Sequence, residues 1–184
     1  MIGEAFKTYI IAECGEDVIL VDKHAAHERY IYEQLKRRQG NLDMQMLLQP
    51  LKASLPYETY GAVSADIEVC TRLGIGIKVL EPPFVEIYAV PTIAADMDAV
   101  QLLLSVGDCL INNKENAGME IFDDLFHTIA CKAAIKAHSD SSVSELETLL
   151  KTVTAEDLRY CPHGRPILIK LTKTEIEKMF RRIV

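Results

Sequence analysis

The chain has 184 residues, of which 49% are hydrophobic and 26% are charged, and it contains no tryptophan. This composition is typical of a globular protein with a packed core, and it excludes a disordered or fibrous chain. The formal net charge of −7 excludes a domain that holds DNA through its bulk charge, because such domains carry a basic surface.

No apolar run approaches the roughly 18 residues that a membrane-spanning helix needs. Residues 1–3 (M-I-G) lack the basic start and apolar stretch of a signal peptide, so we expect a cytosolic protein. The five cysteines are odd in number and scattered, which argues against a disulfide framework. The chain also begins directly in a predicted strand, which indicates a fragment of a longer protein.

The first half of the chain alternates strand and helix signals, separated by Gly, Pro and Asn turns. We predict a hairpin from 6–12 and 17–21, a helix from 24–38 ending at Gly40, an edge strand or loop at 44–55, a helix at 56–73, and strands at 75–80 and 84–90.

The second half is mostly helical. We predict helices at 100–112, 121–138 and 142–153, a strand at 166–171 and a final helix from Thr172 through Ile183. Strands and helices are mixed without a regular βαβ alternation, so the predicted fold class is α+β.

The first cluster of chemically active residues lies where the predicted hairpin meets the first helix. His24 and Glu28 are four residues apart, so both side chains share one helix face, and Asp22 directly precedes the helix. An imidazole with carboxylates is a ligand set for a divalent metal. The alternative is a helix-capping Asp22 with a surface histidine and an ion-paired glutamate.

The second cluster is Cys161 and His163, held two residues apart by a proline and followed by Gly164. A Cys-x-His pair does not complete a zinc site, because structural zinc takes four ligands. We therefore expect partners from elsewhere, with His24 and Glu28 the first candidates and Cys131 another. The alternative for Cys131 is a buried helix cysteine.

Together these motifs resemble one family. Residues 22–28 (D-K-H-A-A-H-E), followed by Glu33, are similar to the metal-binding motif D-Q-H-A-x2-E-x4-E of MutL proteins that nick DNA themselves. Residues 130–132 (A-C-K), 161–166 (C-P-H-G-R-P) and 180–182 (F-R-R) resemble that family's later motifs A-C-[RK], C-[PN]-H-G-R-P and F-x-R, in the same order. The departure is Lys23, where the family usually has Gln; its side chain need not face the metal, and we expect activity to survive.

This resemblance implies a two-lobed α+β fold. The implied dimerisation subdomain with the metal site is discontinuous and comprises residues 1–44 and 130–184, while 45–129 form an inserted regulatory subdomain. It further implies a nicking endonuclease of DNA mismatch repair that hydrolyses a phosphodiester bond with a metal-activated water. The implied catalytic residues are Asp22, His24 and Glu28.

The resemblance also implies the metals and their ligands. The mixed ligand set predicts a regulatory or structural zinc beside a weaker catalytic manganese or magnesium. The expected metal ligands are His24, Glu28, Cys131, Cys161 and His163, and Lys132 and Arg165 are expected phosphate contacts or structural ion pairs.

Residues 45–50 (Q-M-L-L-Q-P) resemble the Q-x-x-[LI]-x-P peptide through which these proteins bind the β sliding clamp. Gln45, Leu48 and Pro50 are the expected contacts, because an extended segment with an apolar anchor inserts into a pocket. The alternative is an ordinary edge strand.

The implied partners are the clamp, MutS, the ATPase domain of the same full-length chain and DNA, which the acidic isolated domain should bind weakly. A homodimer is also implied, with the final helix, the strand at 167–171 and the hairpin as candidate surfaces. Two other functions stay open. One is a non-catalytic dimerisation and clamp-binding module with a structural zinc, and the other is an unrelated zinc hydrolase of small molecules.

Overall fold

The computed structural model describes residues 1–38, 41–112, 119–134 and 140–183, which form two compact units. Unit 1 comprises Met1–Tyr30 and Ala134–Val184, and unit 2 comprises Ile31–Ala133. The chain therefore leaves unit 1, forms unit 2 and returns. The first predicted subdomain boundary, after residue 44, lies 14 residues later in the sequence than the boundary between the units, and the second, before residue 130, lies four residues earlier. The dimerisation and regulatory roles of the two parts stay a prediction.

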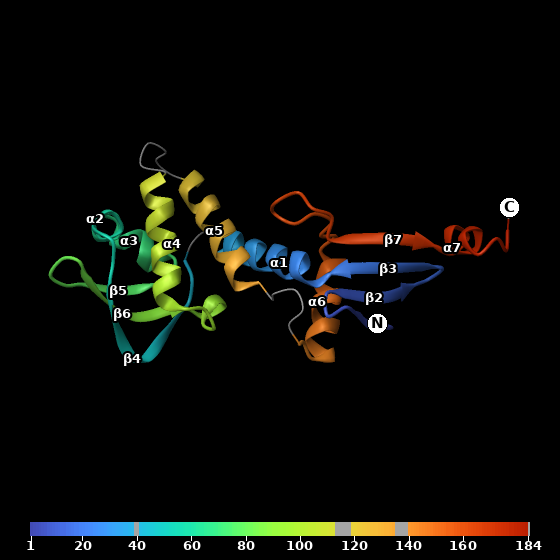
Figure 1. The fold of residues 1–184 in the computed structure, drawn as a ribbon, viewed down its shortest axis with the longest axis horizontal. Helices are drawn as coiled ribbons and strands as arrows, with labels where there is room; N and C mark the ends of the chain where they lie inside the picture. Colours follow the sequence, from blue (N-terminus) through green and yellow to red (C-terminus); the bar gives the residue numbers. More distant parts are fainter. Residues whose placement is uncertain (39–40, 113–118, 135–139, 184) are drawn as a thin grey trace. The chain divides into compact units, whose positions relative to one another are not determined.

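Unit 1 is built on a four-stranded antiparallel sheet of order β1-β2-β3-β7, in which Figure 1 shows β2, β3 and β7 side by side. The strands are β1 (Gly3–Ala5), β2 (Tyr9–Cys14), β3 (Asp17–Asp22) and β7 (Leu168–Thr172). Gly15 (φ +64°) forms the tight β2–β3 turn, since this backbone conformation strains residues with a Cβ. The predicted hairpin is confirmed.

The core of unit 1 lies on one face of this sheet. Ile10 and Val21 are paired across β2 and β3 and are fully buried. Helix α6 (Val143–Ala155) places Leu146, Leu149 and Val153 against them at helical spacing. The start of helix α1 (Lys23–Arg37) contributes two small residues, Ala25 and Ala26, to the same core.

The opposite face of the sheet also carries apolar side chains, which we call the outer apolar face. Ile11, Leu20 and Ile169 are paired across three strands, and Val18 pairs with Leu171 beside them. These five side chains are half-buried or exposed, with Ile169 55% exposed. Both faces of the sheet are therefore apolar, but only one is packed into the core of unit 1.

Unit 2 combines a three-stranded antiparallel sheet of order β4-β6-β5 with helices. Its elements are β4 (Met44–Ser54), α2 (Tyr57–Ala65), α3 (Ile67–Arg72), β5 (Gly76–Val79), β6 (Phe84–Pro91), the 3-10 turn η1 (Thr92–Ala94), α4 (Ala99–Asn112) and α5 (Met119–Ala133). The predicted edge position of β4 is confirmed. Gly107 of α4 allows a close approach to α2, because a Cβ there would lie 2.3 Å from Thr59 Cγ2.

Two predicted helices differ from the structure. The helix predicted at 56–73 is two helices, because Asp66 leaves the helical conformation with φ −120° and ψ 46°. The final helix, α7 (Lys173–Met179), ends short of Ile183, since Arg181 takes a positive φ of 54°. Gly40 and residues 135–138, the predicted ends of two further helices, lie outside the described residues. The predicted α+β class is confirmed.

All five cysteines lie within the described residues and none forms a disulfide, as the sequence predicted. Burial raises the pKa of the Cys70 thiol to about 12, so this side chain is an inert core residue. Cys14 and Cys131 are exposed, and Cys161 is buried. Of the two buried cysteines, Cys161 alone belongs to a group of three potential metal ligands within the described residues.

Candidate metal centre

The first half of the candidate centre is the junction of β3 and α1. Asp22 ends β3, and its carboxylate Oδ1 accepts a hydrogen bond from the Ala25 backbone N–H at 3.0 Å. This contact satisfies one of the open N–H groups of the first helical turn, as an N-cap does. Because Ala25 and Ala26 are buried in the core, the first turn of α1 is fixed against the sheet. Glu28 follows one turn later.

The second half is a closed loop between α6 and β7. The Ile167 N–H donates to the Arg159 carbonyl at 2.8 Å, and the Cys161 N–H donates to the Arg165 carbonyl at 2.8 Å. Gly164 has φ +79° and donates its N–H to the Cys161 carbonyl at 2.8 Å, closing the tip. The loop is thus held by its own backbone, with Cys161 directed into the core of unit 1 and His163 exposed.

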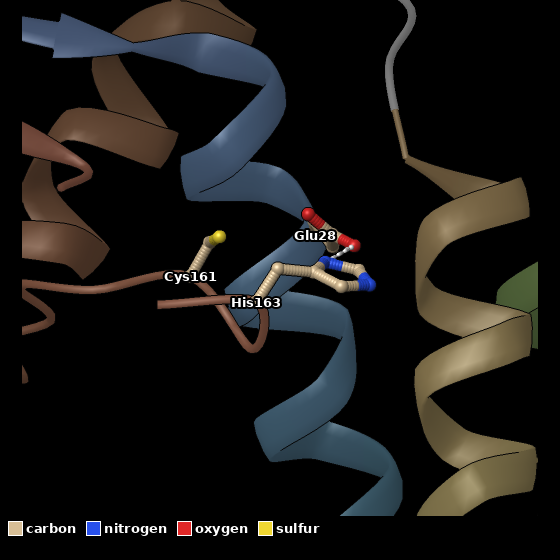
Figure 2. Close-up of side chains that lie close together, drawn as sticks. All are labelled: Glu28, Cys161 and His163. Atoms are coloured by element: carbon tan, nitrogen blue, oxygen red, sulfur yellow. Dashed lines mark ion pairs between the residues drawn. The ribbon is translucent and has the colours of Figure 1, made fainter. Parts of the chain in front are cut away.

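These two halves bring Glu28, Cys161 and His163 together (Figure 2). One ligand atom from each lies within 4.8 Å of the other two. The side chain of Glu28 is 4% exposed and that of His163 is 51% exposed, so the cluster opens to solvent on the histidine side. A carboxylate, a thiol and an imidazole therefore converge at the edge of the core.

Glu28 Oε1 has an ion-pair contact but no hydrogen bond from the described residues. His163 Nδ1 lies 2.9 Å from it, at ion-pair distance, but the geometry at the ring nitrogen is not that of a hydrogen bond. Oε1 is fully buried and accepts no hydrogen bond from the residues that the structure describes. Burying a carboxylate oxygen costs free energy unless a donor or a cation satisfies it. This oxygen fits a metal ligand.

The other two residues of the first predicted cluster are not in this group. Asp22 uses one carboxylate oxygen for the helix cap, and His24 is half-buried. His24 lies near enough to influence His27, whose pKa is lowered by burial first and by His24 second, against an opposing effect of Glu145. The structure thus joins Glu28 to Cys161 and His163 and leaves Asp22 and His24 outside the three-residue cluster.

Lys23, the departure from the family pattern, is fully buried. Its Nζ lies 2.7 Å from Glu4 Oε1 on β1 and 3.4 Å from Ser141 Oγ. Its backbone N–H donates to the Thr8 carbonyl. The side chain therefore ties β1 and the segment before α6 to the start of α1. This burial could not be predicted from the sequence, because lysine side chains are almost always exposed.

Three further candidates are not members of this group. Arg165 is exposed and lies in the loop itself, where its carbonyl accepts from Cys161. Cys131 and Lys132 are exposed on α5 in unit 2. Cys131 follows Asp123 and His127 at four-residue spacing, so the three residues share one face of α5. Its role as a ligand stays a prediction.

The same face of α5 contacts the second half of α1 within unit 2. The Tyr32 hydroxyl donates to Asp123 Oδ1 at 2.6 Å, and the Tyr32 ring lies 4.6 Å from that of His127. Lys36 Nζ donates to the same hydroxyl at 3.4 Å. His127 therefore packs against Tyr32.

Residues 45–50 lie in β4, whose regular pairing with β6 is interrupted after Met46. Met46 pairs with Ala89 of β6, but the next pair is Leu51 with Ile87, so residues 47–50 bulge out of the ladder. Leu48 is fully exposed, and Gln45 and Pro50 are also exposed. The predicted clamp-binding contacts are thus all on the surface of unit 2.

No helix in the described part of the chain is both long and apolar enough to cross a bilayer. A family model described as "MutL C terminal dimerisation domain" matches residues 2–141. Proteins named "DNA mismatch repair protein MutL" are similar along the chain. That of Clostridium tetani is 35% identical over 190 residues, and that of Caldanaerobacter subterraneus subsp. tengcongensis is 32% identical over 184.

A third, from Kosmotoga olearia, is 33% identical over 182 residues. These matches cover 100%, 100% and 99% of this chain but 30%, 31% and 30% of the relatives. The chain therefore spans slightly under a third of the length of these proteins.

Proposed function

The chain belongs to the family of MutL C-terminal dimerisation domains, and we propose that it is the dimerising, metal-dependent DNA-nicking part of a mismatch-repair protein. The observation that carries the proposal is the cluster of Glu28, Cys161 and His163, with a buried carboxylate oxygen that accepts no hydrogen bond from the described residues. This group supports a metal site at the edge of the core, and the nicking assay below separates a catalytic site from a structural one.

The residues of the cluster fit zinc. Thiolate, imidazole and carboxylate are its usual ligands, and tetrahedral ligands at normal zinc distances stand roughly 3.5 Å apart. The three atoms, within 4.8 Å of one another, need only small movements to reach that spacing. Three protein ligands would leave a fourth position for a further ligand in a structural or regulatory site.

Asp22 and His24, with Glu28, are the proposed ligands of a second, weaker metal such as manganese or magnesium. When bound, such a metal supplies Lewis-acid chemistry that stabilises charge on a phosphodiester and generates the nucleophile. Arg165 and Lys132 are proposed to hold phosphate. The exposed side of the cluster, at His163, is the side from which DNA would approach.

The test combines elemental analysis with nicking of supercoiled plasmid in manganese. His163→Ala and Cys161→Ser should lose zinc, whereas Cys14→Ser, which changes an exposed cysteine, should keep it. Asp22→Asn should lose nicking because the metal loses its carboxylate, although asparagine caps a helix equally well. Asp157→Asn is the matched control, since Asp157 is exposed and its positive φ suits asparagine.

Full zinc retention in both His163→Ala and Cys161→Ser would reject the zinc site. Normal zinc content without any manganese-dependent nicking would instead favour the alternative, a dimerisation and clamp-binding module with a structural zinc. Nicking by Asp22→Asn at the wild-type rate would remove that carboxylate from the catalytic group.

The bulge at 47–50 supports binding to the β sliding clamp, because an exposed apolar anchor outside the ladder is free to enter a pocket. Gln45→Ala and Leu48→Ala should weaken clamp binding in an anisotropy assay with little change in thermal stability. Gln49→Ala is the matched control, as it removes the same side chain at a motif position that is not specified. Unchanged affinity in a Gln45→Ala, Pro50→Ala double variant would reject the assignment.

A two-fold homodimer through the outer apolar face is the proposed assembly. Leu20 and Ile169 lie at its centre, and Met179 at the end of α7 and Phe180 directly after it are 70% and 72% exposed. An obligate interface of this kind buries on the order of 2,000 Å². Sedimentation at low micromolar concentration should show a dimer, and Ile169→Glu should yield the 20.6 kDa monomer. A wild-type monomer at that concentration would contradict the proposal.

The remaining proposed partners are DNA, MutS and the ATPase domain of the full-length chain, in the cytoplasm. An acidic domain binds DNA weakly by itself, so tethering by these partners would supply the local concentration. Weak nicking by the isolated domain is therefore expected.

A further inference from the structure

The loop that carries Cys161 and His163 is closed by its own hydrogen bonds, and its contacts with α1 decide where the two ligands lie. Three contacts with α1 are described. Cys161 packs with Ala25 and Ala26 in the core, His163 lies 2.9 Å from Glu28, and Arg29 Nη1 donates to the Tyr160 carbonyl at 3.3 Å.

These contacts differ in what a metal would do to them. The contact between His163 and Glu28 joins two residues that would bind the ion. Metal binding would therefore replace this contact with bonds to the metal. The contact of Arg29 uses a guanidinium and a backbone carbonyl, neither of which belongs to the ligand set. It is therefore available both with and without metal.

The position of Arg29 makes the contact effective. Arg29 directly follows Glu28 in α1, and Tyr160 directly precedes Cys161 in the loop. One hydrogen bond thus joins the residue that follows Glu28 to the residue that precedes Cys161. A guanidinium presents its donors in a rigid planar fork, so less freedom is lost in holding a carbonyl than with a flexible ammonium.

We propose that Arg29 is a positioning residue for the metal centre, which holds the loop against α1 so that Cys161 and His163 meet Glu28 before the metal arrives. This inference rests on the proposed zinc site. Preorganised ligands bind a metal more tightly because less order has to be created on binding. The contribution of Arg29 should therefore appear in the zinc affinity.

The experiment measures zinc affinity of the purified protein by competition with a chromophoric chelator. Arg29→Gln should raise the zinc Kd about 10- to 100-fold, the usual range for residues that orient metal ligands. Arg29→Lys, which keeps the charge and most of the chain, should fall between Arg29→Gln and wild type. Arg159→Gln is the matched control, because Arg159 lies at the base of the same loop but its side chain pairs with Asp157.

The unfolding free energy of each metal-free variant in urea separates positioning from folding. A positioning residue changes the Kd of the folded protein, whereas a purely structural one lowers metal-free stability and leaves that Kd unchanged. If Arg29→Gln does not fold, Arg29→Lys provides the test instead. Its zinc Kd should then be at least several-fold above that of the wild type. Wild-type Kd in Arg29→Gln, or in Arg29→Lys where Arg29→Gln is unfolded, would overturn the inference.

An equal loss of affinity in Arg159→Gln would also overturn it. Failure of the zinc site itself would look different, because His163→Ala would then bind zinc like the wild type.

Discussion

At the scale of single residues, the buried pair of Lys23 and Glu4 has unequal partners. Lys23 is fully buried, whereas the Glu4 side chain is 20% exposed. Removing the carboxylate deprives a fully buried ammonium of the anion 2.7 Å away, while removing the ammonium leaves a carboxylate that still reaches water. Breaking a buried pair is costly chiefly through the charge that stays behind.

We therefore expect Glu4→Gln to lower the free energy of unfolding by about 3 kcal/mol. Lys23→Gln, which installs the residue usual in the family, should change it by less than about 1 kcal/mol, since a neutral amide can donate to Glu4. Urea unfolding of both variants at neutral pH provides the measurement. Equal losses in the two variants would contradict the expected asymmetry.

At the scale of elements, α6 and α7 begin with the same capping box but differ in what they bury. Ser142 and Glu145 cap α6, and Thr172 and Glu175 cap α7, with both reciprocal hydrogen bonds present in each. Helix α6 buries three residues in the core of unit 1, and α7 buries none. The same local motif therefore supports different amounts of tertiary structure.

Ser142→Ala should lower the free energy of unfolding by about 1 kcal/mol, because α6 unfolds only with the core. Thr172→Ala should fray α7 alone, which hydrogen exchange would detect as faster exchange of its amides at nearly unchanged global stability. A global loss in Thr172→Ala equal to that in Ser142→Ala would show that α7 folds cooperatively with the sheet.

Sequence periodicity predicted most elements because their apolar spacing is regular. It missed β1, since three residues are too few to show a pattern. It predicted one helix in place of α2 and α3, because the spacing of apolar residues continues across Asp66 although the backbone leaves the helical conformation there. It extended α7 to Ile183 because Phe180 and Ile183 keep helical spacing. The positive φ of Arg181 has no sequence signal.

The ligand cluster was harder to predict than the fold. Helical spacing placed His24 beside Glu28 on one face of α1, and motif order suggested the loop as their partner. The sequence did not distinguish Glu28, whose oxygen is buried beside His163, from His24, which lies outside the cluster. That distinction depends on where a closed loop meets the helix, which is tertiary packing. Arg29 was missed for the same reason.

At the scale of the whole molecule, charge is divided unevenly between the units. Unit 1 has 12 Lys and Arg against 13 Asp and Glu, whereas unit 2 has 8 against 14. The ligand cluster thus belongs to a nearly neutral unit, and most of the net negative charge belongs to the other. The acidity of the chain therefore says little about the surface around the metal centre.

Neutralising exposed acids of unit 2 should raise DNA affinity at low salt, because repulsion of the phosphates is reduced. The triple variant Glu81→Gln, Asp96→Asn, Asp108→Asn should bind a labelled duplex about 3- to 10-fold more tightly at low ionic strength. The gain should shrink at 0.2 M salt, where charges are screened over less than about 8 Å. No gain at low salt would mean that unit 2 does not repel the duplex.

Because unit 1 is discontinuous in the sequence, its candidate metal ligands are translated at different times. Glu28 is translated about 130 residues before Cys161 and His163. At 5–20 residues per second, the delay between them is on the order of ten seconds. All of unit 2 is translated in that interval. A nascent chain therefore cannot assemble the three-ligand cluster before all of unit 2 has been translated. Translation order alone delays the candidate metal centre until unit 2 exists.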